Sequence, residues 1–100
     1  MTVKAGDRIK FFSEKRPYCV RAADRRYAIC TKPFNLKHTT IYTIIDFKED
    51  VRGPDNVIFG LGYETDADAA RALAQLQAGE IEVSYRRRIP LDIERVIPAD

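Results

Sequence analysis

The sequence predicts an α+β fold: a curled antiparallel β-sheet, or a partly open small β-barrel, with one α-helix at about residues 66–78 packed on it. Short runs in which apolar and polar residues alternate, as they do in strands, are separated by turn signals. One alanine-rich segment has helical spacing instead. An order of four or five strands, one helix and one or two strands favours an antiparallel sheet that carries a single helix.

Three strands are predicted early in the chain, at residues 8–12, 18–23 and 27–32. A two-residue loop at Asp24 and Arg25 would fix the register of the second and third strands. On the more apolar face, which we expect to point into the core, this register pairs Tyr18 with Thr31, Val20 with Ile29, and Ala22 with Tyr27. On the other face it pairs Cys19 with Cys30, Arg21 with Ala28, and Ala23 with Arg26. Asp-Arg is a poor residue pair for such a turn, and a longer loop would shift the pairing.

Residues 39–47 are predicted to form the central strand, because β-branched residues dominate and apolar groups occupy both faces. Residues 33–38 are predicted as a loop, and residues 48–56 as a polar connection. A short buried strand is expected at residues 57–59.

The helix is expected to begin at Thr65 or Asp66 and to end at Ala78, with Gly79 as its stop. Its narrow apolar stripe consists of Ala69, Ala72, Leu73 and Leu76. Clean alternation then predicts a strand at residues 81–86, followed by Pro90 and a final edge segment at residues 91–97.

The 100 residues are expected to form a single domain, 1–100, with 45% hydrophobic and 32% charged residues. No apolar run is long enough to span a bilayer, and the N-terminus lacks the apolar segment of a secretory signal, so no membrane association is expected. Two cysteines without a secretory signal favour a cytoplasmic location and free thiols over a disulfide.

Charge is distributed unevenly along the chain, although the net charge is only +2. Residues 1–45 contain ten Lys or Arg and three Asp or Glu, whereas residues 46–83 contain three and nine. Such asymmetry indicates a basic face for an anionic partner, unless the two blocks interleave in space and cancel.

No metal site, cofactor or catalytic residue is predicted. Cys19, Cys30 and His38 lack both a fourth ligand and the close spacing of a structural zinc site. A glycine pair at residues 60–62 precedes the helix, as in phosphate-binding turns, but Asp66 and Asp68 would repel a phosphate there. A small enzyme using Cys30, His38 or Asp46 would need these groups to converge in one pocket.

Basic residues interleaved with aromatic ones give the strongest functional indication, because exposed sheets with this composition suit nucleic acid. The aromatic residues are Tyr18, Tyr27, Phe34 and Tyr42, of which the predicted register places Tyr18 and Tyr27 in the core. An ordinary solvated sheet face is the alternative. The candidate nucleic-acid-binding residues are Arg16, Arg21, Arg25, Arg26, Lys32, Lys37, Arg86 and Arg88.

A resemblance to known sequences covers most of the chain and is carried by the segments 16–24, 30–35, 42–46, 52–56 and 79–84. These segments look like parts of small uncharacterised proteins from bacterial and phage genomes. The resemblance implies a phage- or mobile-element-associated accessory protein, and it assigns no fold, ligand or functional residue.

The sequence therefore predicts a non-catalytic binding protein that contacts nucleic acid through a basic hairpin face. The alternative is an accessory module that binds a host protein, or a second copy of itself, through a sheet edge or the loop at Phe34.

Overall fold

The two ends of the chain meet in one seven-stranded sheet. The computed structural model describes residues 2–31, 42–53, 66–80 and 89–99. Their elements, in chain order, are β1 (Arg8–Phe11), β2 (Tyr18–Ala23), β3 (Tyr27–Thr31), β4 (Tyr42–Asp46), β5 (Val51–Arg52), α1 (Asp66–Gln77), β6 (Ile89–Pro90) and β7 (Ile93–Ile97). Neighbouring strands are antiparallel, in the order β6-β5-β4-β3-β2-β1-β7. The predicted α+β class, with a curled antiparallel sheet and a helix packed on it, is confirmed.

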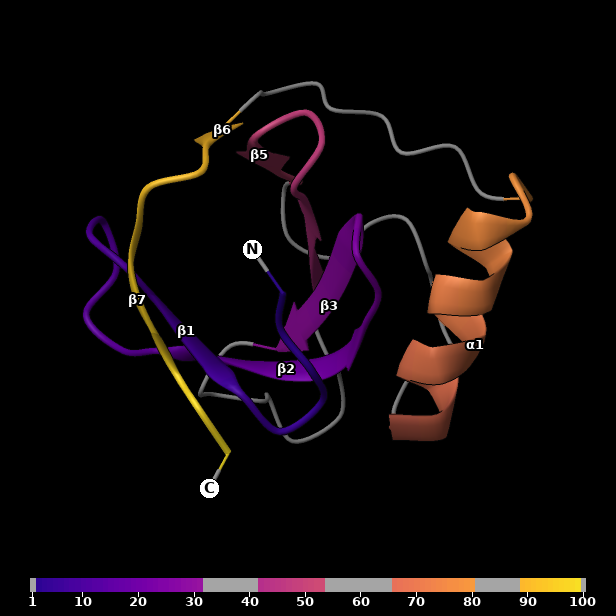
Figure 1. Cartoon of the computed structure of the whole chain (residues 1–100), viewed down its shortest axis with the longest axis horizontal. Coiled ribbons are helices and arrows are strands. Elements are labelled where there is room, and N and C mark those ends of the chain that lie inside the picture. Colours follow the sequence, from indigo (N-terminus) through magenta and orange to yellow (C-terminus); the bar gives the residue numbers. More distant parts are fainter. Residues whose placement is uncertain (1, 32–41, 54–65, 81–88, 100) are drawn as a thin grey trace.

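The C-terminal segment joins the two edges of this sheet. β6 pairs with β5 at one edge and β7 pairs with β1 at the other, and only Leu91 and Asp92 separate β6 from β7. The sheet therefore curls into a half-barrel, and the C-terminal segment passes along its rim (Figure 1). The predicted final edge segment is β7.

The sheet has a buried cluster on each face. Inside the curl the core residues are Val3, Ile9, Phe11, Tyr18, Val20, Ala28, Cys30 and Ile45. On the outer face, α1 covers part of the sheet with a second core of Ala22, Ile29, Ile44, Ala69, Ala72 and Leu76. β4 is central as predicted, since Ile44 and Ile45 are buried on opposite faces.

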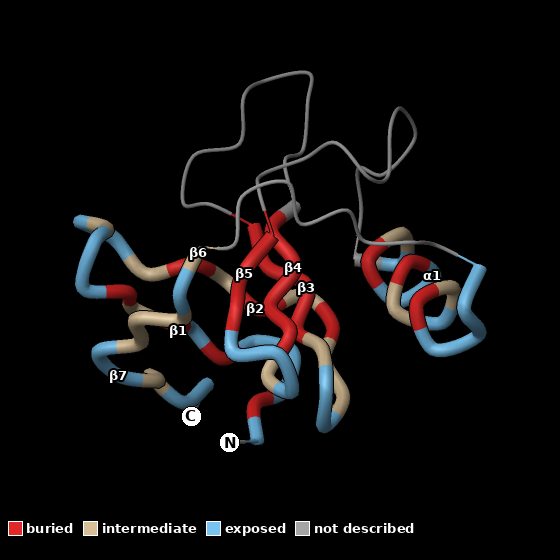
Figure 2. The backbone as a smooth tube through the Cα atoms, turned by 90° about the horizontal axis from the view of Figure 1, so that it is seen from above, coloured by how far each residue is buried: buried red, intermediate tan, exposed pale blue. Residues whose placement is uncertain are grey.

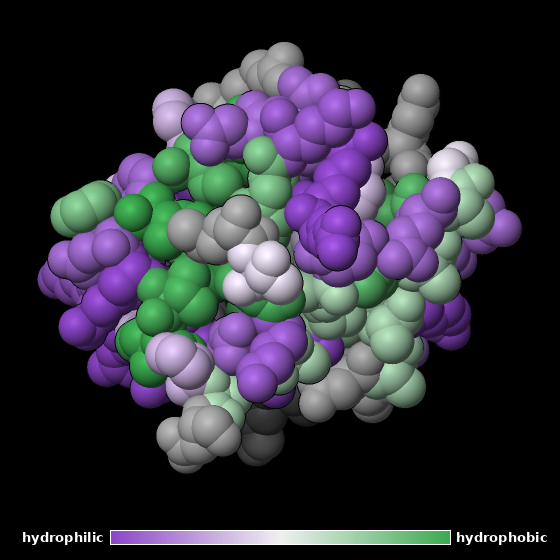
Figure 3. Space-filling model, viewed as in Figure 1, coloured by the Kyte–Doolittle hydropathy of each residue, from purple (hydrophilic) through white to green (hydrophobic). Residues whose placement is uncertain are grey.

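Views of the whole molecule show the same division. Figure 2 shows that buried residues dominate β3, β4 and β5, whereas β7 contains only intermediate and exposed residues. In Figure 3, hydrophobic side chains gather within the ring of strands and hydrophilic ones surround them.

The predicted register of the β2–β3 hairpin is wrong. The observed pairs are Cys19–Thr31, Val20–Cys30, Ala22–Ile29 and Ala23–Ala28. The turn residues are Arg25 and Arg26, because Asp24 donates its backbone N–H to the Tyr27 carbonyl. The pairing then shifts by one residue at a β-bulge between Val20 and Ala22. Tyr18 consequently lies in the inner core, whereas Tyr27 packs on the outer one.

β5 lies in a segment that the sequence predicts as a polar connection. Asp50 adopts a left-handed backbone conformation with φ of 56°, which ends the turn at residues 47–50. Val51 and Arg52 then pair with Asp46 and Ile45 and are both buried. The sequence does not predict this strand because two residues, of which one is apolar, are too few to show an alternating pattern.

The helix agrees closely with its prediction. α1 ends at Gln77, and Gly79 follows with φ of +71°, the conformation that favours glycine after a helix. Ala69, Ala72 and Leu76 are buried and Leu73 is half-buried, so the predicted stripe faces the sheet. α1, with 12 residues, is too short to cross a membrane, and the described part of the chain contains no longer helix.

The remaining predicted elements lie wholly or partly outside the described residues. These are the loop at 33–38, the first residues of the strand at 39–47, the strands at 57–59 and 81–86, and the cap at Thr65.

Candidate functional site

The structure describes four of the eight basic residues predicted to bind nucleic acid. These are Arg16, Arg21, Arg25 and Arg26. Lys32, Lys37, Arg86, Arg88 and the predicted partner-contact residue Phe34 lie outside the described residues.

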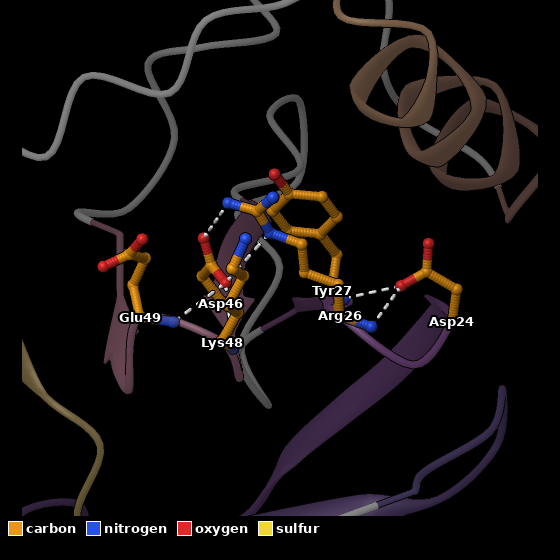
Figure 4. A network of polar contacts seen from close by, with 6 residues as sticks. All are labelled: Asp24, Arg26, Tyr27, Asp46, Lys48 and Glu49. Atoms are coloured by element: carbon orange, nitrogen blue, oxygen red, sulfur yellow. Dashed lines mark hydrogen bonds and ion pairs between the residues drawn. The ribbon is translucent and has the colours of Figure 1, made fainter.

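Arg26 is neutralised by a carboxylate of the following strand (Figure 4). Its Nε and Nη2 atoms donate to the two carboxylate oxygens of Asp46 at 3.3 and 3.2 Å, and its guanidinium lies 4.8 Å from the centre of the Tyr27 ring. Asp46 is 1% exposed and also accepts the backbone N–H groups of Lys48 and Glu49. The hydrogen bond to Asp46 raises the pKa of Arg26. This pair holds two adjacent turns together and compensates the charge of Arg26, although the arginine side chain stays 43% exposed.

Asp24 explains why the hairpin turns where it does. Its Oδ1 accepts the backbone N–H groups of Arg26 and Tyr27 at 2.7 and 2.6 Å, and its Oδ2 accepts the side-chain amide of Gln77 at 2.8 Å. Burial acts to raise the pKa of Asp24, but these hydrogen bonds outweigh it and the pKa is lowered. Asp24 therefore ties the hairpin turn to the end of α1.

The other three predicted arginines do not form one cluster. Arg16 precedes β2 and Arg25 follows it, and a six-residue strand separates its ends by about 20 Å. Arg21 lies between them at the bulge and donates from Nε to the Thr31 hydroxyl at 2.8 Å. The described members of the predicted set are therefore spread along the hairpin rather than gathered at one point.

A different set of cations comes together on the outer face of β1, β2 and β7. In β1, Ile9 and Phe11 point into the inner core, so Arg8 and Lys10 point outward. Arg95 of β7 lies directly opposite Lys10 and therefore shares this face.

Arg21 extends this set onto β2. Arg8 lies opposite Cys19, Cys19 lies opposite Thr31, and Arg21 donates to Thr31, so these side chains share one face. We call Arg8, Lys10, Arg21 and Arg95 the outer cationic face.

One carboxylate accompanies these four cations in the three strands. Glu94, at the bulge of β7, approaches Lys10 with 3.5 Å between Oε2 and Nζ. The Lys10 side chain is only 16% exposed, and its ammonium also donates to the Phe11 carbonyl. Asp7, just before β1, is buried and accepts the backbone N–H groups of Lys4 and Ala99, which lower its pKa. Asp7 is therefore occupied in joining the two ends of the chain, and within β1, β2 and β7 the four cations of the outer cationic face outnumber the one carboxylate.

The helix leaves this face uncovered. α1 packs on Ala22, Ile29 and Ile44, toward the middle of the sheet. In Figure 1 it lies on the opposite side of the molecule from β1 and β7. Arg8, Lys10 and Arg95 were not among the site residues predicted from the sequence, although alternation in 8–12 places Arg8 and Lys10 on the same side of the strand. What joins them to Arg95 is the pairing of the first strand with the last.

A buried arginine supports the connection that follows β1. Arg52 is 7% exposed, and its guanidinium lies 4.4 Å from the centre of the Phe11 ring. It donates to the Tyr18 hydroxyl at 3.3 Å and to Ser13 Oγ at 3.1 Å, and it approaches Glu14 Oε1 at 3.5 Å. Arg52 thereby fixes residues 13 and 14 against β5.

The described residues offer no metal or nucleophilic centre. They contain no group of three or more His, Cys, Asp or Glu able to hold a metal ion. Both cysteines are free, and the observed register removes the predicted Cys19–Cys30 opposition. Cys30 lies in the inner core, where burial raises the pKa of its thiol. Asp46 is saturated with hydrogen bonds, and His38 lies outside the described residues.

Comparison with known proteins found no matching family model, curated protein or solved structure.

Proposed function

We propose that this chain is a non-catalytic protein that binds nucleic acid through the outer cationic face. The observation that carries the proposal is the direct opposition of Lys10 and Arg95 across β1 and β7, with Arg8 on the same face. A cross-strand pair of like charges destabilises a sheet, whereas a pair of opposite charges stabilises it. A phosphate bound by the exposed side chains of Arg8 and Arg95 would offset this repulsion.

The layout of the cations suits a phosphate backbone. Arg8 and Lys10 are two residues apart on one strand, a spacing of about 7 Å, and Lys10 and Arg95 are neighbours across about 5 Å. Arg21 continues the line toward β2. Contacts of this kind fix the position of a nucleic acid without reading its sequence, so the proposed binding has little sequence preference.

Salt-dependent binding tests the proposal. Fluorescence anisotropy would measure the Kd for labelled single- and double-stranded oligonucleotides between 50 and ~300 mM salt. Neutralising the face with R8Q, K10Q and R95Q together should weaken binding at least tenfold and lower the slope of log K against log salt by about 0.7 to 0.9 for each lost phosphate contact.

The matched control is R25Q, because Arg25 is an exposed arginine outside this face. R25Q should bind like the wild type. Absence of binding at 50 mM salt, or equal losses in R25Q and in each single variant of the face, would refute the proposal.

A protein partner remains the second candidate from the sequence. Retention of a partner from a nuclease-treated bacterial lysate, combined with no affinity for oligonucleotides, would favour it over nucleic acid. A cytoplasmic location and a phage or mobile-element setting belong to the same proposal. The free state of both cysteines is compatible with a reducing compartment.

A further inference from the structure

An exposed aromatic ring lies at the end of β1, next to the outer cationic face. Phe12 is 69% exposed and is the one large hydrophobic side chain that is exposed among the described residues. It directly follows Phe11, the last residue of β1, and begins the turn that the Glu14 N–H closes on the Phe11 carbonyl. Phe12 is two residues beyond Lys10 along the chain, so its ring lies close to the cations of β1.

Backbone hydrogen bonds hold Phe12 in this position. Its N–H donates to the Asp92 carbonyl at 2.9 Å, which continues the β1–β7 pairing by one residue. The next N–H, of Ser13, donates to the Asp92 carboxylate at 3.0 Å, and the N–H of Glu14 donates to the Phe11 carbonyl at 3.2 Å. The backbone that carries the exposed ring is therefore fixed on both sides.

Contacts of buried side chains also hold the residues that follow Phe12. Arg52 bonds Ser13 and approaches Glu14, the two residues that follow Phe12. Glu14 also accepts the Tyr18 hydroxyl at 3.0 Å. The exposed Phe12 ring lacks the stabilisation that a Phe side chain normally obtains from burial. Contact between the ring and a ligand would bury it and provide this stabilisation.

We infer that the ligand of the outer cationic face is a single-stranded nucleic acid, with the Phe12 ring stacked on an unpaired base while the exposed side chains of Arg8 and Arg95 hold the neighbouring phosphates. Every base offers a π-face to an aromatic ring, so this contact adds affinity without sequence preference. Bases in a duplex are already stacked on one another and cannot cover the ring. The inference rests on the proposed function and adds to it the preference for single strands.

Substitutions at Phe12 test the inference, because the exposed position tolerates change. F12L keeps an apolar side chain and removes the ring, and it should bind oligo(dT) roughly tenfold more weakly, with duplex affinity unchanged. F12W keeps a stacking ring and should bind oligo(dT) at least as tightly as the wild type. The protein contains no other Trp, so the fluorescence of the introduced indole reports on position 12 alone.

The fluorescence of F12W should be quenched by oligo(dT) but not by a duplex of equal length or by inorganic polyphosphate, which has charge and no bases. Urea denaturation of F12L and F12W would show that both fold like the wild type.

The outcomes separate the inference from the proposed function. If F12L binds oligo(dT) like the wild type while the R8Q, K10Q and R95Q combination loses binding, the stacking role is wrong and the proposed function stands. Equal quenching by polyphosphate and oligo(dT) would also overturn stacking. If neutralising the face leaves oligo(dT) binding intact, the proposed function itself fails.

Discussion

Lys10 and Arg95 face each other across the β1–β7 pair, two cations in a position where unlike charges stabilise a sheet. Glu94 offsets part of this repulsion from the side, at 3.5 Å from Lys10. The Lys10 ammonium also donates to the Phe11 carbonyl. A phosphate bound as proposed would offset the repulsion that remains.

Arg95→Glu is predicted to stabilise the fold and to weaken oligonucleotide binding. With a carboxylate opposite Lys10, the free energy of unfolding should rise by about 0.2–1 kcal/mol at low salt, while affinity for oligonucleotides falls. Urea denaturation at low and high salt would measure the gain, which screening should reduce. The gain should vanish in the K10M/R95E double variant, and a loss of stability in R95E alone would contradict the prediction.

Arg52 is predicted to stabilise the fold through its apolar contacts as well as its charge. Arg52→Ala removes the contact with the Phe11 ring and the bonds to Ser13 and Tyr18, so we expect a loss of about 2–4 kcal/mol. Arg52→Met keeps most of the packing volume and should lose less. Unfolding by urea, followed by circular dichroism, would compare the two. A change below ~0.5 kcal/mol in R52A, the range of ordinary surface substitutions, would contradict the prediction.

Acid should destabilise the protein below the ordinary pKa of an aspartic acid. The pKa values of Asp7, Asp24 and Asp92 are all lowered from 3.8 in the folded state. For Asp92, burial acts to raise the pKa, but hydrogen bonds from Ser13 outweigh it. The unfolded chain then binds protons more tightly than the folded one. These groups therefore contribute fully above about pH 4, and their contribution is lost as pH falls through the lowered values.

The urea midpoint measured between pH 2 and 7 tests this dependence. The midpoint should be nearly level above pH 5 and fall steeply below pH 4. Asp24→Asn removes one of the three groups and should make the acid fall shallower. An unchanged slope in that variant would show that Asp24 does not contribute.

Only one of the two thiols is predicted to react in the folded protein. Cys30 lies in the inner core and burial raises the pKa of its thiol, so almost none of it is thiolate at pH 8. Cys19 is half-exposed on the outer face. Mass spectrometry after iodoacetamide treatment should find one modification, at Cys19, and two in urea. Modification of Cys30 in the absence of denaturant would contradict the described packing.

Local patterns in the sequence were sufficient for most of the elements and for much of the core. Alternation in 8–12 and 18–23 identified β1 and β2, and the stripe at Ala69 and Leu76 identified the buried side of α1. These predictions succeeded because side-chain direction follows from strand or helix period alone.

The hairpin register failed for a local reason. A carboxylate at Asp24 that accepts the next backbone N–H groups moves the turn to Arg25 and Arg26, and the bulge at Arg21 then shifts the rest. An Asp before a turn is a known signature of this geometry and favours the observed turn. Nothing in the sequence marks the bulge.

The candidate site was harder to predict because it depends on distant pairings. Arg95 reaches Lys10 only because the last strand pairs with the first. The carboxylate that pairs with Arg26 comes from the next strand, at Asp46. Charge counted along the chain shows neither relationship, since both are properties of strand order.

The pairing of Arg8 with Ile97 also determines when β1 can complete its pairing while the protein is being synthesised. β7 follows β1 by about eighty residues, so this edge of β1 stays unpaired while the residues between the two strands are made. Nascent chains on neighbouring ribosomes could pair through it, and Arg8 and Lys10, which repel their counterparts on another copy, would oppose this.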